Sequence, residues 1–186
     1  MEVFTISLFV LWQVIQQTIW PKNPVLIVNN FTFQNGIAVT ADLNAVFRNS
    51  IFWGDAGIVN NEVIVTKQGA NPFTVLFEKN IYRVLNDPVN STLTGNIKNQ
   101  NPAFDTIDVN KRIFDFRITK NLSAPGINAG LLTGFLKDLD NNNRNVGLPD
   151  LGCYEKQWPA PSLRTSFVLV ERTPKGKESG VDSKKI

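Results

Sequence analysis

Three oxygen-bearing side chains at alternate positions, Asp138, Asp140 and Asn142, form a pattern that could bind a cation. Ca²⁺ takes six to eight oxygen ligands, and a calcium loop supplies them at alternate positions with a closing carboxylate. Here the sixth position of such a loop is Asn143 rather than glycine, and the twelfth is Pro149 rather than glutamate. These departures favour no cofactor, with calcium held by the first three residues as the alternative.

A structural cap around Arg144 is the competing interpretation of the same stretch. The planar guanidinium group of Arg144 could pair with the carboxylate of Asp150 or of Glu155, because an arginine fork matches a carboxylate. Asp138 would then cap a turn. This interpretation needs no metal and makes Arg144, Asp150 and Glu155 structural residues.

Two further sets of side chains could act on a carbohydrate. Asp105, Asp108 and Asp115 suggest hydrolysis by a carboxylate pair, which requires a defined separation across a sugar. They lie among Thr, Asn and Lys, where aspartate commonly fills turns, so we predict turn residues and assign no catalytic residue. Trp53 and Tyr82 are candidate carbohydrate-stacking residues, with a buried aromatic ladder as the alternative.

Composition narrows the chemistry further. The chain of 186 residues has no histidine and one cysteine, Cys153, which excludes Ser-His-Asp and Cys-His catalysis, an internal disulfide and nearly all zinc chemistry. Residues 156–186 hold 7 basic and 3 acidic residues, whereas residues 1–155 hold 12 and 13. The basic charge therefore belongs to the tail, and we expect no nucleic-acid partner.

The elements that must position these residues are strands. The chain contains 22 asparagines, which form turns well and helices poorly. Short segments rich in Val, Ile and Phe alternate with turns containing Asn, Gly and Asp, and no long stretch has helical periodicity. An all-β chain follows, with strands predicted at Val25–Val28, Ile37–Thr40, Ala45–Trp53, Glu62–Thr66, Phe73–Phe77 and Ile81–Leu85, and a loop or excursion at 88–100.

A weak internal repeat suggests how these strands stack. Asn30, Asn49 and Asn80 each follow a short, mostly apolar segment and have an apolar residue within the next two positions, at spacings of 19 and 31. Repeats of about 20 residues or more indicate solenoids. In a parallel β-helix, inward side chains stack into apolar ladders, and an asparagine at equivalent turns can form a hydrogen-bonded ladder.

The two ends of the chain differ from its body. Residues 1–21 form an apolar segment, and the 18 positions from Val3 to Trp20 carry no charge. This run is close to the length of a membrane span, yet apolar residues at even positions from Phe4 to Val14 favour a strand. We therefore expect either a buried rung or a membrane contact through residues 3–20. Residues 156–186 are expected to form a basic, largely flexible tail.

Several segments in order resemble bacterial right-handed parallel β-helix repeat proteins of the pectate-lyase-like superfamily, of the cell-surface type with a C-terminal anchor or capping region. The resemblance covers 34–155. It is carried by the segments Phe47–Gly54, Asn96–Phe104, Phe116–Gly130, Asp138–Arg144 and Pro149–Glu155.

The resemblance implies a short, right-handed parallel β-helix of few coils over residues 22–155, with a C-terminal capping region around 121–155. It also implies a non-catalytic module, secreted or on the bacterial cell surface at the outer membrane, that binds polysaccharide, adheres or supports a larger β-helix. One alternative is the terminal part of a polysaccharide lyase or glycoside hydrolase. Another is a truncated fragment, without independent function, whose upstream coils are missing.

Overall fold

The computed structural model describes residues 3–7, 10–11, 23–54 and 59–157. Every regular element in these ranges is a strand, from β1 to β14. The prediction of an all-β chain is therefore confirmed for this part of the molecule. No helix that is long and apolar enough to cross a membrane occurs among these residues.

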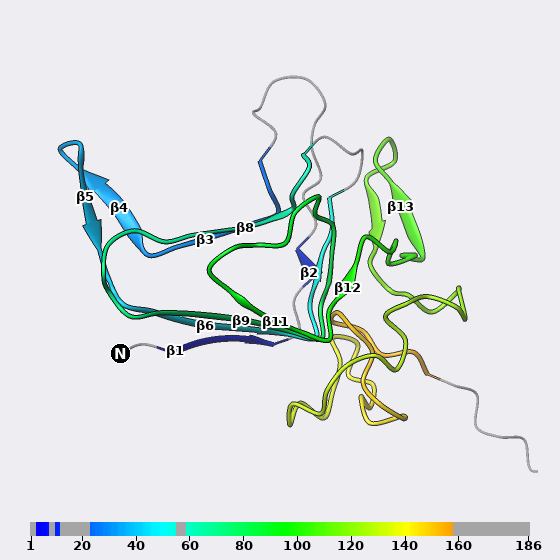
Figure 1. Cartoon of the computed structure of the whole chain (residues 1–186). Coiled ribbons are helices and arrows are strands. Elements are labelled where there is room, and N and C mark those ends of the chain that lie inside the picture. The colour runs from blue at the N-terminus through cyan, green and yellow to red at the C-terminus, as the bar shows by residue number, and fades with distance from the viewer. Residues whose placement is uncertain (1–2, 8–9, 12–22, 55–58, 158–186) are drawn as a thin grey trace, which may run out of the picture.

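Three parallel sheets contain most of the strands (Figure 1). Sheet A has the order β1 (Val3–Ser7), β6 (Leu43–Arg48), β9 (Phe73–Glu78) and β11 (Thr92–Thr94). Sheet B has the order β12 (Ile97–Lys98), β10 (Ile81–Tyr82), β7 (Ile51–Phe52) and β2 (Val10–Leu11). Sheet C pairs β3 (Leu26–Asn29) with β8 (Val63–Thr66).

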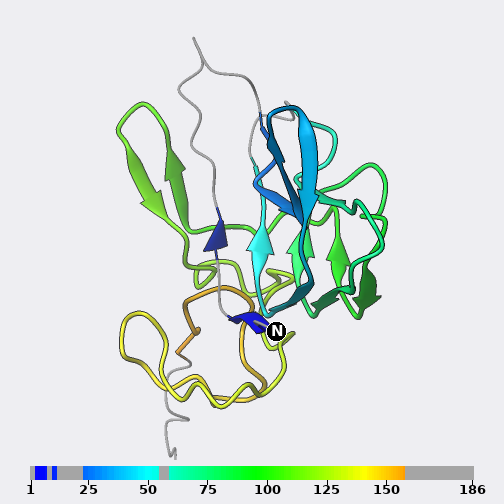
Figure 2. The ribbon, with the colours of Figure 1, turned by 90° about the vertical axis from the view of Figure 1, so that its left-hand side faces the viewer.

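Successive passes of the chain visit the three sheets in the same order. One pass runs through β3, β6 and β7, and the next runs through β8, β9 and β10. Ala45 lies beside Val75 in sheet A, so one pass takes about 30 residues. The segment predicted as a loop at 88–100 instead contains β11 and β12, which extend sheets A and B by a shorter third pass. Seen from the side in Figure 2, the parallel strands of successive passes lie next to one another.

Two antiparallel hairpins interrupt the passes. β4 (Phe31–Gln34) pairs with β5 (Ile37–Thr40), and β13 (Thr106–Asp108) pairs with β14 (Ile113–Asp115). The first hairpin turns at Asn35 and Gly36, whose φ angles are 50° and 79°. Positive φ at both central positions is the two-residue turn that matches strand twist, and Asn-Gly is its preferred sequence.

The core lies between the three sheets. Alternate residues of β6 and β9 face inward, and the Phe47 and Phe77 rings stack with centroids 4.8 Å apart. Phe52 and Tyr82 enter the same cluster from sheet B, and Val28 and Val65 enter it from sheet C. Each buried Val or Phe contributes about 1.5–3 kcal/mol through removal of apolar surface from water. The stacking of like residues therefore holds the passes in register.

The corner between sheets A and B determines how the asparagines align. Asn49, Lys79 and Gly95 occupy equivalent positions, with φ angles of 50°, 54° and 58°. The next position holds Ser50, Asn80 and Asn96, and it is this position that forms the ladder. The expected equivalence of Asn49 and Asn80 is therefore wrong by one residue.

Hydrogen bonds show this ladder directly. The Asn80 side-chain oxygen accepts the Ser50 N–H at 2.9 Å, and its amide group donates to the Phe47 carbonyl at 2.9 Å. Asn96 repeats the arrangement with the Asn80 N–H and the Phe77 carbonyl. Asn30 is not part of this ladder, because its amide lies at another corner and bonds Ala41 and Gln68.

The C-terminal segment, residues 116–157, packs on a side of the stack. Ile51, Trp53 and Ile81 point outward from sheet B and form a second cluster with Leu151. Ile97, Phe104 and Ala129 pack around this cluster. The segment expected as a cap, around 121–155, therefore covers the outer face of sheet B. A cap at the end of the stack would instead cover the open strands of the last pass.

The ends of the chain lie partly outside the described residues. Val3–Ser7 pairs with β6, and Val10–Leu11 pairs with β7, so these residues take the strand alternative for the N-terminal segment. Residues 12–22, and the tail from residue 158, lie outside the described ranges. The predictions of a membrane contact and of a flexible tail therefore remain predictions there.

Candidate functional site

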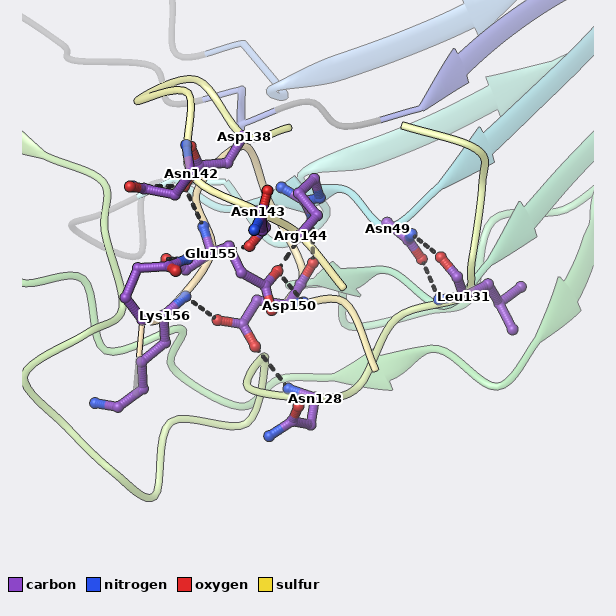
Figure 3. A network of polar contacts seen from close by, with 11 residues as sticks. Asn49, Asn128, Leu131, Asp138, Asn142, Asn143, Arg144, Asp150, Glu155 and Lys156 are labelled. Carbon is purple, nitrogen blue, oxygen red and sulfur yellow. Dashed lines mark hydrogen bonds and ion pairs between the residues drawn. The ribbon is translucent and has the colours of Figure 1, made fainter. Parts of the chain in front are cut away.

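The side chains expected to form a cap come together in a buried cluster (Figure 3). Arg144 is 1% exposed, and its Nη2 donates to the Asp150 backbone carbonyl at 2.6 Å. The same nitrogen lies 4.0 Å from the Glu155 carboxylate, so no bidentate fork onto a carboxylate forms. Nη1 of Arg144 is buried without a hydrogen-bond partner.

Backbone N–H groups satisfy the two acids of this cluster. The Asp150 carboxylate accepts the N–H groups of Asn128 and Lys156, each at 2.7 Å, while Glu155 accepts the Asp150 N–H at 2.9 Å. Burial raises the pKa of Asp150, raises the pKa of Glu155 to about 7, and lowers the pKa of Arg144. The cluster therefore links residues 128, 144, 150 and 155–156 of the C-terminal segment, which is the arrangement expected of a structural cap.

The three calcium candidates do not converge on one point. Asp138 accepts the Asn142 N–H at 2.7 Å and the Glu155 N–H at 2.9 Å, which is the turn-capping role. Asp140 instead faces Arg117, with Oδ2 2.6 Å from Nη2. N–H donors therefore occupy both carboxylates, and the described residues contain no group of three or more His, Cys, Asp or Glu side chains arranged for a metal.

The two candidate stacking residues are buried, which corrects their proposed role. Tyr82 is 2% exposed and belongs to the inner core, and burial raises the pKa of its hydroxyl to about 12. Trp53 is 9% exposed, and the Arg83 guanidinium lies 5.7 Å from the centre of its ring. Neither ring presents a face to a carbohydrate in solvent, because strand alternation directs one inward and the C-terminal segment covers the other.

Asp105, Asp108 and Asp115 each bond to nearby donors, but Asp108 and Asp115 are the last residues of β13 and β14 rather than turn residues. Asp105 accepts the Lys120 N–H and the Thr119 hydroxyl, and Asp108 accepts the Lys111 N–H at 2.9 Å. Asp115 pairs with Arg117 at 2.9 Å. Each of these carboxylates therefore has donors of its own within the fold.

An open groove lies between sheet A and the C-terminal segment. It encloses about 790 Å³ and is lined by Arg48, Glu78, Leu131, Leu132, Thr133, Phe135 and Leu148. We call it the apolar groove. Leu132, Phe135 and Leu148 are 67%, 52% and 54% exposed, which is unusual for side chains of this size. A groove with a mostly apolar lining and a few polar groups is the usual form of a ligand site.

One ion pair, which we call the polar pair, lies in this groove. Arg48 and Glu78 end β6 and β9 on the outward face of sheet A, and Nε of Arg48 lies 2.6 Å from Oε2 of Glu78. Their side chains are 36% and 23% exposed. The pair carries no net charge, yet it offers donors and acceptors to a ligand that rests on the apolar wall.

The opposite wall depends on Asn49. Its side-chain oxygen accepts the Leu131 N–H at 2.8 Å, and its amide group donates to the Leu131 carbonyl at 2.7 Å (Figure 3). Gly130 precedes this point, and a Cβ there would lie 2.8 Å from the Pro149 carbonyl oxygen, which only glycine avoids. Asn49 lies one residue before the ladder position. Its side-chain amide therefore bonds the groove wall at Leu131 and not the next pass.

Sequence reasoning did not find the apolar groove. Its residues come from segments 48–78 and 131–148, and their meeting depends on the C-terminal segment folding back over the stack. The sequence does contain one local sign of an exposed apolar surface. Its residues match neither the alternation of a half-buried strand nor the continuous apolar run of a fully buried one: Leu131, Leu132, Phe135, Leu136 and Leu139. No family model, curated protein or solved structure matches the chain.

Proposed function

We propose that this chain is a short right-handed parallel β-helix that binds a neutral polysaccharide in the apolar groove without cleaving it. The parallel order of sheets A, B and C and the repeated visiting order of the strands support the β-helix. The right hand is the one that twisted parallel strands favour in their crossovers. A polysaccharide ligand also fits the secreted or bacterial cell-surface location that we propose for the protein.

The observation that carries the binding proposal is one exposed aromatic ring beside one polar pair. A sugar ring has an apolar C–H face and a rim of hydroxyl groups. Phe135 would pack on the face, and Arg48 and Glu78 would bond the hydroxyls, with Leu132 and Leu148 excluding water. The neutral pair favours a neutral chain over an acidic one, because an acidic sugar would face Glu78.

The lining also bears on catalysis. Glycoside hydrolysis commonly uses two carboxyl groups on either side of the scissile bond. Among the described residues that line the groove, Glu78 is the single carboxylate, and it is paired with Arg48. These residues therefore supply recognition more readily than acid–base chemistry, which supports a binding module over the terminal part of a lyase or hydrolase.

Calorimetric titration with a panel of neutral and acidic polysaccharides tests the proposal. Phe135→Ala should weaken binding of a neutral polysaccharide by about tenfold, which corresponds to about 1.4 kcal/mol. Arg48→Gln should weaken it to a similar extent, and Leu122→Ser, at an exposed position outside the groove, should leave it unchanged. Equal affinity in all three variants would remove the groove from the proposal.

Two further outcomes distinguish the alternatives. Release of reducing ends or of unsaturated products from any polysaccharide would show that the chain is the end of an enzyme. Aggregation, or unfolding without a cooperative transition, would favour a fragment of a longer β-helix, since open ends of a solenoid expose unpaired strands.

A further inference from the structure

The hairpin β4–β5 projects away from the stack at the corner between sheets C and A (Figure 1). It carries large apolar side chains into solvent, with Phe33 62%, Ile37 71% and Val39 44% exposed. Ile27, in the strand that leads into the hairpin, is 52% exposed. Isolated single hydrophobic residues on a surface are ordinary, whereas a contiguous group marks an interaction site.

Both faces of the hairpin carry large apolar side chains, and the face with Ile37 and Val39 also carries Thr32 and Gln34. The register pairs Phe33 with Ala38 and Gln34 with Ile37, so Phe33 lies on one face and Ile37 and Val39 lie on the other. The ring of Phe31 lies edge-on to that of Phe33 at 5.7 Å on the first face. A protein surface covers one face of a hairpin, whereas a lipid phase surrounds both.

The absence of charge and the small exposed area of the hairpin also favour a lipid surface over a protein partner. No charged residue occurs from Asn23 to Ala41. Phe33, Ile37 and Val39 together expose on the order of 300 Å² of surface, well below the roughly 800 Å² per partner of a stable protein interface. Four residues of strand reach about 13 Å, which spans the 5–10 Å over which peripheral apolar groups enter the headgroup and acyl boundary.

We propose that the tip of this hairpin inserts into the surface of a lipid bilayer. Phe33, Ile37 and Val39 enter the acyl boundary, and the Asn35–Gly36 turn leads. The strand hydrogen bonds between β4 and β5 satisfy the backbone of the inserted part, apart from its outer edges. The site is separate from the apolar groove and does not depend on the polysaccharide proposal.

Co-sedimentation of the full chain with phosphatidylcholine vesicles tests this. The wild-type chain should bind, and Phe33→Ser with Ile37→Ser should lower the bound fraction at least fivefold. The matched control removes as many exposed apolar side chains elsewhere, with Leu122→Ser and Leu139→Ser, which are 65% and 70% exposed in the wild type. It should bind as the wild type does, and all variants should keep the wild-type thermal transition.

A probe at the tip gives an independent readout. Gln34→Cys, in a Cys153→Ser background, allows an environment-sensitive dye to be attached beside Ile37. Its emission should shift to the blue on addition of the same vesicles, also at high salt, and Phe135→Ala should leave the shift unchanged.

Several results would overturn the proposal. The proposal fails when the wild-type chain does not sediment with vesicles. It also fails when the hairpin variant and the control variant lose vesicle binding to the same extent. Binding that needs anionic lipid and disappears at high salt would assign it to basic residues. Dimerisation without vesicles that is lost in the hairpin variant, together with an unshifted probe, would make a second copy of this chain the partner.

Discussion

The side chain of Asn49 is joined to the backbone of Leu131 by two hydrogen bonds, across 82 residues of sequence. Both groups of the amide are used, so the corner between sheets A and B fixes the first residue of the groove wall. Asn49 is also fully buried and has a φ of 50°, a conformation that asparagine tolerates better than most residues.

Replacement of Asn49 by glycine should therefore separate the groove wall from the sheet. Asn49→Gly keeps the positive φ accessible but removes both bonds to Leu131, at a cost of about 1–3 kcal/mol in the free energy of unfolding. Polysaccharide affinity should fall with it, measured by calorimetry at a temperature where the variant is folded.

The equivalent corner one pass later provides the matched control. Lys79 has a φ of 54°, and the end of its side chain lies beside Gly95 in the next pass. Lys79→Gly should therefore leave the groove intact and stabilise the fold by up to about 1 kcal/mol, because a lysine in this conformation is strained. Similar losses of stability in both variants would show that the corner needs a side chain for another reason.

The Asn80 ladder should carry a large share of the stability of the stack. Asn80→Ala leaves the Ser50 N–H and the Phe47 carbonyl without their side-chain partners inside the core, and we expect a loss of about 2–4 kcal/mol in urea unfolding. Asn86→Ala, at an exposed position in the third pass, should change the free energy of unfolding by less than about 0.5 kcal/mol. A small effect at Asn80 would mean that water replaces its bonds.

Strand positions were largely accessible from sequence, whereas the register of the corner was not. The predicted strands at 37–40, 62–66 and 73–77 match β5, β8 and β9 to within a residue, because Val, Ile and Phe favour strands and, in β8 and β9, alternate with a buried face. The predicted strand 45–53 is split at Asn49 and Ser50. Asn49 and Asn80 look alike in sequence, and only backbone φ and stacking order show that Ser50 is the true counterpart of Asn80.

The hairpin and the burial of Trp53 illustrate two further limits of prediction from sequence. The uncharged strand Phe31–Gln34 is missing from the sequence prediction, although its partner β5 is present in it, and both strands are largely exposed. Trp53 was considered for stacking because it ends a strand beside Gly54. Its burial depends on Leu151, almost a hundred residues away in sequence, so no local pattern could reveal it.

The buried Arg144 should be costly to remove alone and much less costly to remove with its acidic neighbour. Arg144→Met deletes the cation near Asp150 and Glu155 and should lower the free energy of unfolding by about 3–5 kcal/mol. Adding Glu155→Gln should recover part of that loss, because Asp150 is then the one buried carboxylate of this pair that lacks the cation. A double-mutant cycle in urea measures the coupling, and additive losses would contradict it.

Glu155 should make the protein less stable as the pH rises through neutrality. Burial raises the pKa of its carboxyl group to about 7 from 4.5, while the Asp150 N–H and Arg144 act in the opposite direction and Asp138 adds to the increase. The folded state therefore holds the proton more tightly than the unfolded state. This contribution is fully present below pH 4.5, falls between about pH 4.5 and 7, and is lost above pH 7.

Glu155→Gln isolates this contribution, since glutamine keeps an oxygen for the Asp150 N–H but cannot ionise. Urea unfolding from pH 5 to pH 8 should show a smaller decline for the variant than for the wild type. The variant should be the more stable of the two above pH 7, where the wild type must bury a carboxylate or take up a proton. Parallel curves would show that Arg144 fully compensates the Glu155 charge. A residual decline in the variant is expected from Asp150, whose pKa burial also raises.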